Sequence, residues 1–389
     1  MNDSATGLQS AQALAAEAQR LRAERRWSEA LDLSVAAAEA APGDPAILQD
    51  LALLLTKLGR LEEGEAVHRQ ALTLVPNSAL LLYSLAHNLL AQGRYREAWP
   101  LHAARVDVPG LNHGFPRGFP FPRWQGEPLD GKRIAVFPEQ GQGDQIQLAR
   151  FLPRLIGLGG RVTLLSPPSL VALFDYNFAN IEVVAAEGQT EFPDPDYWIT
   201  LYDLPAIFGA TLAELPSAPY LTPPSRLPKE SGFRIGLRDR GNPNHINDMF
   251  RSLPPDMARR LRDELPGAVV DLDPDVSGAR DFAETAAILS SLDLVVSVDT
   301  AVAHLAGALG LPCLLLLSGF SPDWRWMFGR DDSPWYPRHR LYRGAIDGTW
   351  DAAVDRVIAD ARAFADTNGG EAPSALPSDT PPPKHTPAP

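Results

Sequence analysis

The sequence contains a single cysteine, Cys313, among its 389 residues. One cysteine excludes an internal disulfide framework and a zinc site built from cysteines. Basic residues are also in the minority: 35 lysines and arginines stand against 48 acidic residues, for a net charge of −13. General nucleic-acid or anionic-membrane binding needs a positive field, so this balance argues against both. It does not exclude a local basic pocket for a phosphorylated ligand.

Long apolar runs are missing as well. No stretch approaches the roughly 18 residues that a transmembrane helix needs. The first residues, Met1–Ser4, show no basic segment followed by an apolar one, as a signal peptide would. We therefore expect a soluble cytoplasmic protein without an integral membrane segment. At about 150 residues per domain, the length predicts two to three domains.

The first hundred residues repeat with a period of 34. Five sets of positions follow this step: Ala18, Ala52 and Ala86; Ala30, Gly64 and Ala98; Trp27, Leu61 and Tyr95; Gly59 and Gly93; Pro42 and Pro76. Small side chains at two fixed points let paired helices approach, and the proline begins the next unit. The pattern resembles a tetratricopeptide repeat array of three units over residues 11–108. A plain helical bundle with accidental periodicity is the alternative.

A change of pattern follows the repeats. Prolines and aromatic residues interleave in a connector at 109–131, which predicts an ordered, packed strap. Strand-like and helical segments then alternate, as in parallel sheets covered by helices. The proline-rich stretch 216–228 separates two α/β lobes, 132–228 and 229–366. The last segment, 367–389, is rich in proline and is predicted to be disordered.

The strands and helices expected in the lobes are read from apolar runs and helical spacing. Expected strands are 133–137, 162–165, 181–184, 197–201, 233–237, 269–272, 292–298 and 313–317, and expected helices are 144–157, 254–265, 282–291, 301–309 and 350–365.

The most informative segment is 297–310, where a buried strand turns into a helix that starts near Ala301. Such a turn presents unpaired backbone N–H groups and the positive end of the helix, which together suit a phosphate. Thr300 adds a hydroxyl donor, and His304 lies one turn along the helix. The alternative is that Asp299 or Thr300 only caps the helix and that His304 packs in the core.

This segment resembles the donor-binding motif of family 9 glycosyltransferases, the heptosyltransferase-like group, roughly S-x-D-T-x-x-x-H-L-A. Residues 139–147 resemble the Gly-Asp loop near the start of that module, and residues 241–254 resemble the loop after the first strand of its donor domain. Residues 322–326 and 333–337 resemble bacterial proteins that join tetratricopeptide repeats to this module. The resemblance implies an all-α tetratricopeptide repeat array followed by a GT-B-like pair of Rossmann-like domains.

The resemblance also implies roles for individual residues. Asp144 aligns with the loop aspartate that deprotonates the acceptor hydroxyl, and one carboxylate suffices for an inverting transfer. The alternative is that Asp144 is a helix N-cap in a capping box with Gln147. The donor and its phosphates would be bound by Gly143, Asn242, Arg251, Ser252, Asp299, Thr300, Ala301 and His304.

Two tryptophans, Trp324 and Trp326, are candidates for stacking on the base or the sugar, with packing in the core as the alternative. No metal and no cofactor are expected, since the nucleotide sugar is a co-substrate. The cluster of aspartates at 271–275 lacks the Gly and Glu positions of an EF-hand loop.

One departure from the family pattern stands at Arg238–Arg240, where an apolar run is usual. It either alters donor choice or marks a weakened site. The leading hypothesis is a bacterial hexosyl- or heptosyl-type transferase whose repeats hold a protein acceptor, with flagellin suggested by similar repeat-bearing flagellin modifiers. Two alternatives stay open: a lipopolysaccharide or polysaccharide acceptor, and a non-catalytic scaffold with a decayed transferase half.

Overall fold

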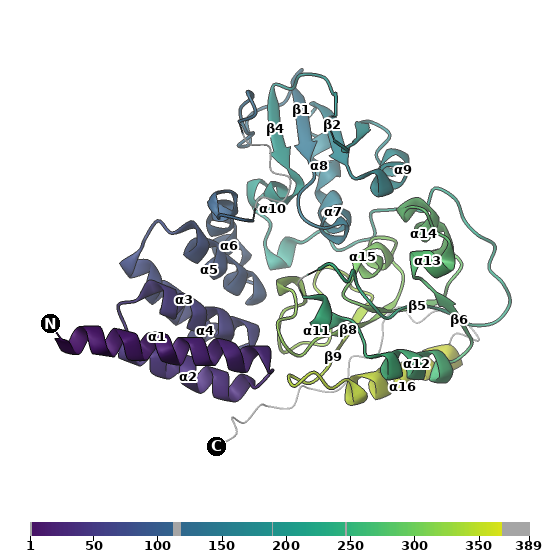
Figure 1. Ribbon diagram of the computed structural model, residues 1–389. Coiled ribbons are helices and arrows are strands. Elements are labelled where there is room, and N and C mark those ends of the chain that lie inside the picture. The colour runs from purple at the N-terminus through teal and green to yellow at the C-terminus, as the bar shows by residue number, and fades with distance from the viewer. Residues whose placement is uncertain (1, 112–117, 189, 246, 368–389) are drawn as a thin grey trace.

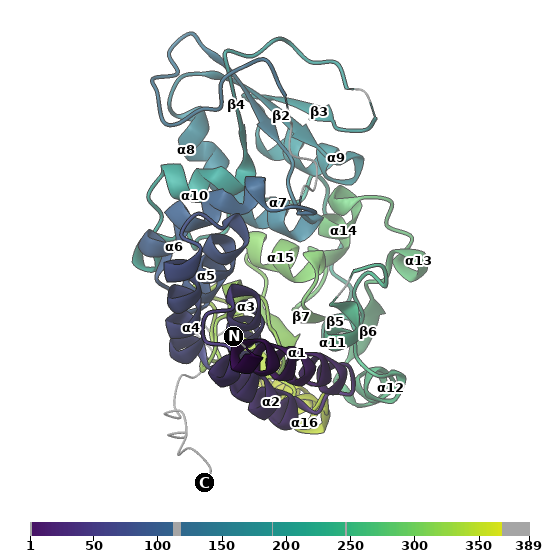
Figure 2. The same cartoon turned by 60° about the vertical axis from the view of Figure 1, so that its left-hand side comes forward.

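The computed structural model describes residues 2–111, 118–188, 190–245 and 247–367. These residues form an N-terminal helical array, an N-lobe and a C-lobe, with the array lying against both lobes (Figures 1 and 2). Residues 112–117 of the expected connector and residues 368–389 of the expected disordered tail lie outside the described residues. Among those described, no helix combines the length and apolarity that crossing a membrane requires.

The helical array is built from pairs of packed helices. Trp27, Leu61 and Tyr95 each begin the second helix of a pair, so the 34-residue step of the sequence is also the step between helices. Asp44 caps one helix by accepting hydrogen bonds from the backbone of Ala46 and Ile47. The helices are α1 (Asn2–Ala23), α2 (Trp27–Ala40), α3 (Pro45–Lys57), α4 (Leu61–Leu74), α5 (Ala79–Ala91) and α6 (Tyr95–His102), followed by the 3-10 turn η1 (Ala103–Asp107).

The turns inside the three helix pairs share the left-handed backbone conformation, and all three face the C-lobe. Arg25, Gly59 and Gly93, 34 residues apart, have φ angles of 59°, 78° and 76°. A Cβ atom on Gly59 would lie 2.7 Å from Phe328, and one on Gly93 would lie 2.9 Å from Met327. Arg25 Nη2 donates to the carbonyl of Met249 at 3.2 Å. All three turns therefore contact the C-lobe, and the two glycines allow a close approach.

The N-lobe contains a parallel sheet which, within the described residues, has the order β3-β2-β1-β4. Its strands are β1 (Arg133–Phe137), β2 (Arg161–Ser166), β3 (Glu182–Ala185) and β4 (Tyr197–Thr200). Its helices are α7 (Gln142–Leu148), α8 (Leu152–Ile156), α9 (Pro168–Asn177) and α10 (Leu204–Ile207), with 3-10 turns η2 (Ala149–Phe151), η3 (Leu201–Asp203) and η4 (Leu212–Glu214).

The described part of the connector runs along this sheet. Trp124 N donates to Trp198 O at 2.9 Å, and Trp198 N donates to Pro122 O at 3.1 Å. Phe119 packs against Phe137 of β1 with ring centroids 5.4 Å apart. The connector thus covers β4 with backbone hydrogen bonds and aromatic packing.

The C-lobe contains a second parallel sheet, in the order β6-β5-β7-β8-β9 for the part of the lobe that is described. β7 and β8 are buried at every position, as expected for central parallel strands covered on both faces. The strands are β5 (Arg234–Arg238), β6 (Ala268–Asp271), β7 (Leu294–Val298), β8 (Cys313–Leu317) and β9 (His339–Arg343). The helices are α11 (Asp248–Arg251), α12 (Pro255–Glu264), α13 (Pro274–Ser277), α14 (Phe282–Leu289), α15 (Ala301–Ala308) and α16 (Asp351–Thr367), with the 3-10 turn η5 (Trp324–Trp326).

Two sequence-based expectations are corrected. The single helix expected over 144–157 is divided into α7 and α8 by η2, with Pro153 in the first turn of α8. The strand β9 was not expected, because its two arginines and one histidine gave it no apolar run.

The array and the two lobes share one hydrophobic core. Tyr95 of α6 accepts a hydrogen bond from Trp335 Nε1 in the C-lobe at 2.8 Å, and both rings are buried. Trp99 Nε1 donates to the carbonyl of Ala210 in the N-lobe at 2.9 Å. Buried Arg105 of η1 forms a bidentate ion pair with Glu139 at 2.7 and 2.8 Å. The array is therefore an integral part of the fold.

Candidate functional site

A cavity of about 810 Å³ lies where the two lobes face each other. Loops at the carboxyl ends of parallel strands line it, among them 140–144 after β1, 241–251 after β5, 299–301 after β7 and 318–325 after β8. This is where open α/β sheets bind ligands. The prediction that the turns at Asp144 and Thr300 face one cleft is confirmed.

The two lobes approach each other closely at Gly143. A Cβ atom there would lie 2.8 Å from His304 Cδ2 and 3.3 Å from Ala301 Cα. Gly143 belongs to α7 of the N-lobe, whereas the other two residues belong to α15 of the C-lobe. Only a residue without a side chain allows this approach, so Gly143 sets the spacing of the cavity walls.

Asp144 lies at the third position of α7 and lines the cavity. Its Oδ2 accepts from the backbone N–H of Gly141 at 2.9 Å, so the N-cap position expected for Asp144 is wrong: Gly141 is the N-cap. Its Oδ1 accepts from Tyr202 Oη at 2.7 Å and from the guanidinium of Arg325. These three donors fix the orientation of the carboxylate.

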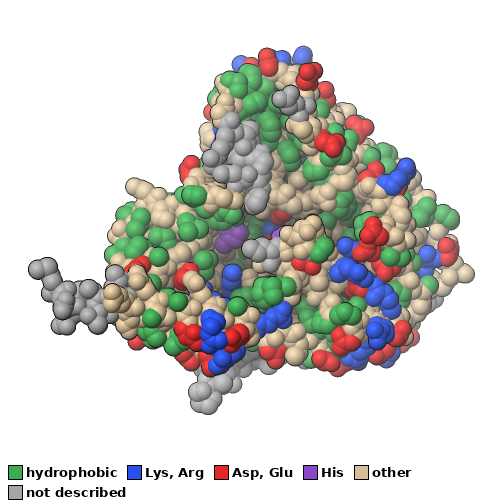
Figure 3. All heavy atoms as spheres, in the orientation of Figure 1, with side chains coloured by type: hydrophobic (Ala, Val, Ile, Leu, Met, Phe, Trp, Pro, Cys, Tyr) green, Lys and Arg blue, Asp and Glu red, His purple; other side chains and the backbone are tan. Residues whose placement is uncertain are grey.

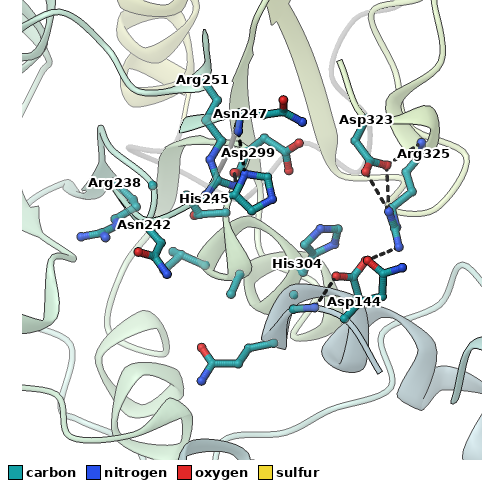
Figure 4. A pocket seen from close by; sticks show the side chains of 18 of the residues that line it. Asp144, Arg238, Asn242, His245, Asn247, Arg251, Asp299, His304, Asp323 and Arg325 are labelled. Atoms are coloured by element: carbon teal, nitrogen blue, oxygen red, sulfur yellow. Dashed lines mark hydrogen bonds and ion pairs between the residues drawn. The ribbon is translucent and has the colours of Figure 1, made fainter. Parts of the chain in front are cut away.

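Arg325 links the two lobes beneath the cavity, a role that the sequence did not reveal. Its Nη1 pairs with Asp323 at 2.8 and 2.9 Å, and its Nη2 donates to Asp144 of the N-lobe (Figure 4). The guanidinium also donates to Tyr202 and Gln147 of the N-lobe. Burial works against its charge, but these carboxylates prevail and hold the pKa of Arg325 well above its ordinary value. The guanidinium therefore stays charged between Asp144 and Asp323.

The turn after β7 presents the N-terminus of α15 to the cavity. Thr300 is the N-cap residue, but its side chain makes no capping hydrogen bond; its Oγ1 lies 3.2 Å from Ser297 Oγ. Asp299, Thr300 and Ala301 all line the cavity. The first N–H groups of a helix have no partner inside it, so they and the Thr300 hydroxyl are available to an anion.

His304 lies on α15 one turn further on and also lines the cavity. Its Nδ1 is 3.0 Å from Tyr336 Oη, and its ring stacks on Trp326 at 5.3 Å. Burial, reinforced by the nearby charge of Arg325, holds the pKa of His304 well below its ordinary value. The neutral ring can supply a hydrogen bond but no positive charge.

Asp299 differs from the other carboxylates of the site. Burial, reinforced by the like charge of Asp323, raises the pKa of Asp299 to about 7. Arg251 contacts this turn through the backbone: Arg251 Nη1 donates to the main-chain carbonyl of Asp299 at 3.1 Å. The carboxyl group of Asp299 therefore titrates near neutral pH.

Of the donor-binding residues predicted in and after the loop that follows β5, two line the cavity and one does not. Asn242 and Arg251 line the cavity, and Arg251 pairs with Asp248 at 3.1 Å. Ser252 does not line it: its hydroxyl accepts from Gly241 N and donates to Asp248 Oδ2, both at 2.9 Å. The phosphate contact predicted for Ser252 is replaced by a role in holding the loop. Ile246, within the same loop, lies outside the described residues.

The two candidate stacking residues differ in their position relative to the cavity. Trp324 lines the cavity wall next to the array, whereas Trp326 is completely buried between His304 and His339. Stacking of Trp326 on a donor is therefore excluded by its burial. The Trp324 ring packs edge to face with Tyr95, and the Arg325 guanidinium lies over it at 4.5 Å.

The arginines at the unusual segment after β5 are neutralised by carboxylates. Arg238 pairs with Asp273 at 2.6 Å, and buried Asp239 pairs with Arg262 at 2.7 Å. Asp271 also pairs with Arg262, at 2.9 Å. The aspartates of 271–275 thus serve ion pairs, and the described residues contain no group of three or more side chains suited to a metal ion.

Every arginine that lines the cavity in the described part of the chain has a carboxylate partner. The pairs are Arg238 with Asp273, Arg251 with Asp248, Arg280 with Glu284, and Arg325 with Asp144 and Asp323. Positive potential toward a phosphate therefore comes mainly from the α15 N-terminus.

Two parallel-sheet lobes with a cavity between the carboxyl ends of their strands form the two-lobed α/β architecture expected for a GT-B-like fold, here with an N-terminal helical region. Residues 254–324 match glycosyltransferase family 9 (heptosyltransferase). This stretch begins at α12 and ends at η5, and it contains the turn at Thr300 and the helix α15. The match thus lies in the C-lobe and includes the strand-to-helix turn that lines the cavity.

Comparison with curated proteins gives a relative, Protein FlbA of Caulobacter vibrioides, 28% identical over 339 residues. The match covers 74% of this chain and 56% of FlbA, so the chain spans little more than half the length of that relative.

Among solved structures, the family 9 glycosyl transferase of Veillonella parvula is 14% identical, with 63% of this chain and all of that chain covered, at a TM-score of 0.41. The heptosyltransferase WaaC of E. coli, solved with ADP-2-deoxy-2-fluoro heptose, is 13% identical, with 59% and 99% covered, at a TM-score of 0.38.

Proposed function

We propose that this chain is an inverting glycosyltransferase that moves a sugar from a nucleotide sugar to a protein hydroxyl without a metal ion. The observation that carries the proposal is the meeting of Asp144 and the α15 N-terminus at one cavity. They come from different lobes, and the close approach at Gly143 holds them together. A carboxylate and an anion site on facing walls are what a direct displacement at a sugar carbon needs.

In the proposed reaction the acceptor oxygen attacks the anomeric carbon while the bond to the diphosphate breaks on the opposite face. Asp144 takes the proton of the acceptor hydroxyl, and the bonding electrons leave with the nucleoside diphosphate. The Arg325 guanidinium also pairs with Asp323, so its charge remains balanced when Asp144 becomes neutral.

The leaving diphosphate would be stabilised by the α15 N–H groups, the Thr300 hydroxyl and the neutral His304 ring. Preorganised donors of this kind stabilise developing charge without needing to reorganise. Arg251 supports them by holding the carbonyl of Asp299. We accordingly propose that no divalent metal takes part.

We further propose that the helical array is a set of tetratricopeptide repeats that binds the acceptor. The 34-residue step between helices supports this assignment, as does the tendency of such arrays to bind proteins and peptides on an extended surface. Flagellin is the acceptor to test first, on the resemblance to repeat-bearing flagellin modifiers.

The test starts with the full-length chain. Thermal unfolding in the presence of ADP, UDP, GDP and CMP identifies the nucleotide that stabilises it most. The corresponding nucleotide sugars are then incubated with purified flagellin, whose intact mass reports transfer. We expect a mass increase of whole sugar units and inversion at the anomeric carbon.

The decisive variant is Asp144→Asn, which should abolish transfer while nucleotide affinity stays within about threefold. Asp263→Asn, at an exposed carboxylate on α12, is the matched control and should behave as wild type. Undiminished transfer by Asp144→Asn would reduce Asp144 to a residue that stabilises the α7 N-terminus. Transfer to a polysaccharide only, or no nucleotide binding at all, would favour the carbohydrate-acceptor and scaffold hypotheses respectively.

A further inference from the structure

One wall of the cavity comes from the helical array. His87 of α5 lines the same cavity as Asp144 and Thr300, although it belongs to neither lobe. Its Nε2 is buried and has no hydrogen-bond partner among the described residues. Figure 3 shows histidine side chains at the floor of a hollow where the array meets the lobes. The array therefore takes part in the site itself.

A row of rings connects this part of the array to Asp144. Tyr83 and His87, one turn apart on α5, have ring centroids 4.4 Å apart, and His87 lies 5.7 Å from His102 of α6. His102 in turn stacks on Tyr202 at 5.5 Å with an interplanar angle of 15°. Tyr202 donates to Asp144 Oδ1 at 2.7 Å. The position of α5 is thus coupled by direct contacts to the orientation of the proposed base.

The cavity has two distinct ends. At one end lie Arg280, Phe282 and Thr285 of the α13–α14 region, and at the other lie His87, Gln140 and Asp323. Figures 1 and 2 both place α15 between α14 and the array. A diphosphate bound at α15 therefore has its nucleoside toward α14 and its sugar toward Asp144, which leaves the end beside the array for the acceptor.

The chemistry of this end favours an uncharged acceptor segment. His87 and Gln140 offer neutral hydrogen-bonding groups, and Asp323 carries a negative charge. Arg325, which lines the same cavity, is paired with Asp144 and Asp323. A phosphorylated glycolipid would bring its negative charge against Asp323, whereas hydroxyl and amide groups of a peptide would find donors and acceptors.

We propose that α5 forms part of the acceptor subsite, with His87 binding the peptide segment that carries the hydroxyl to be glycosylated. This assignment rests on the proposed function, because it takes the acceptor to be a protein. It makes the array both a docking surface and a wall of the reaction site, and it makes His87 an acceptor-specificity residue.

The test is steady-state transfer to flagellin by the full-length chain, with the nucleotide sugar identified as above. We expect His87→Ala to raise the KM for flagellin at least tenfold and the Kd for the nucleotide less than twofold. His87→Phe keeps a ring between Tyr83 and His102 but has no ring nitrogen, so it should lose acceptor affinity as His87→Ala does. His87→Gln restores a hydrogen-bonding group and should recover part of it.

Two controls separate this assignment from a structural effect. His68→Ala removes another buried histidine of the array, on α4 and away from the cavity, and should leave the KM for flagellin unchanged. Tyr83→Phe keeps the ring that packs against His87 and removes only a hydroxyl of a residue outside the cavity lining, so it should also leave that KM unchanged.

The outcomes distinguish a failure of the α5 assignment from a failure of the proposed function. An unchanged KM in His87→Ala and His87→Phe, with transfer by the wild type, would overturn the assignment of α5 and leave the proposed function intact. Full retention of acceptor affinity by His87→Phe alone would also overturn it, since a packing role then suffices. Nucleotide-sugar binding without transfer to flagellin by the wild type would overturn the protein acceptor and this assignment together.

Discussion

Replacing Gly143 by alanine tests whether the contact between the lobes sets the geometry of the cavity. The new Cβ would lie 2.8 Å from His304 Cδ2 and 3.3 Å from Ala301 Cα. The first distance is well inside van der Waals contact, and the second involves backbone that cannot rotate away. The φ angle of Gly143 is not in the left-handed region, so steric overlap is the main cost.

Overpacking of this size costs about 1–3 kcal/mol. Alanine regains about 0.5–1 kcal/mol relative to glycine within a helix, so the central values leave a net loss of about 1 kcal/mol in the free energy of unfolding. Because α7 is pushed away from α15, nucleotide affinity should fall as well. If a cost of about 1 kcal/mol appears entirely in binding, the Kd rises about fivefold, since 1.4 kcal/mol is tenfold.

The assay combines urea unfolding with calorimetric titration of the nucleotide that stabilises the wild type. Gly43→Ala is the matched control, because a Cβ at Gly43 meets nothing within 4 Å and its φ is also outside the left-handed region. That variant should stay within about 0.5 kcal/mol of wild type. Equal stability and equal nucleotide affinity of the two alanine variants would refute the argument that Gly143 fixes the lobe spacing.

Three other predictions concern metal dependence, pH and the core. Transfer should be insensitive to EDTA, while Thr300→Val should lower turnover by about 10²–10³, the usual effect of losing one preorganised donor; loss of activity in EDTA would contradict the metal-free mechanism. The pKa of Asp299 is about 7 in the fold and about 3.9 in an unfolded chain, so its contribution to stability is complete below pH 4 and is lost as the pH rises to about 7. Urea unfolding should therefore show that the wild type loses stability relative to Asp299→Asn between pH 4 and 7, and parallel pH profiles would contradict the raised pKa. Tyr95→Phe leaves the buried Trp335 N–H without its acceptor and should cost about 1–3 kcal/mol in urea unfolding, whereas Tyr176→Phe, at an exposed ring, should cost nothing measurable; equal stabilities would mean that another group satisfies the indole.

The parallel sheets could be predicted from the sequence because their central strands are buried on both faces. β8 is an uninterrupted apolar run, and every one of its residues is buried. β9 could not be predicted, because its polar groups are satisfied only by tertiary contacts. His339 Nε2 lies 3.0 Å from the carbonyl of Ala303, and Arg343 donates to the carbonyls of Trp326 and Met327.

The candidate site also has one part that could be predicted from the sequence and one part that could not. The turn at Thr300 and the loop at Asp144 could be predicted, because each lies within one short motif. Arg325 could not be paired with Asp144 from the sequence, because 181 residues separate them and no local spacing rule connects them. His87 was hidden for a related reason: a helical period predicts which residues face the core of the array, but not which face another part of the chain.

The three left-handed turns of the array fix the spacing of the units between them. Arg25, Gly59 and Gly93 each meet a different partner on the C-lobe. Repeat arrays that stand free in solution gain or lose units readily, because each unit contacts only its neighbours. Here the insertion or loss of a 34-residue unit between Arg25 and Gly93 would move a turn out of register with its partner. The length of this segment is therefore expected to stay constant as long as the C-lobe keeps its shape.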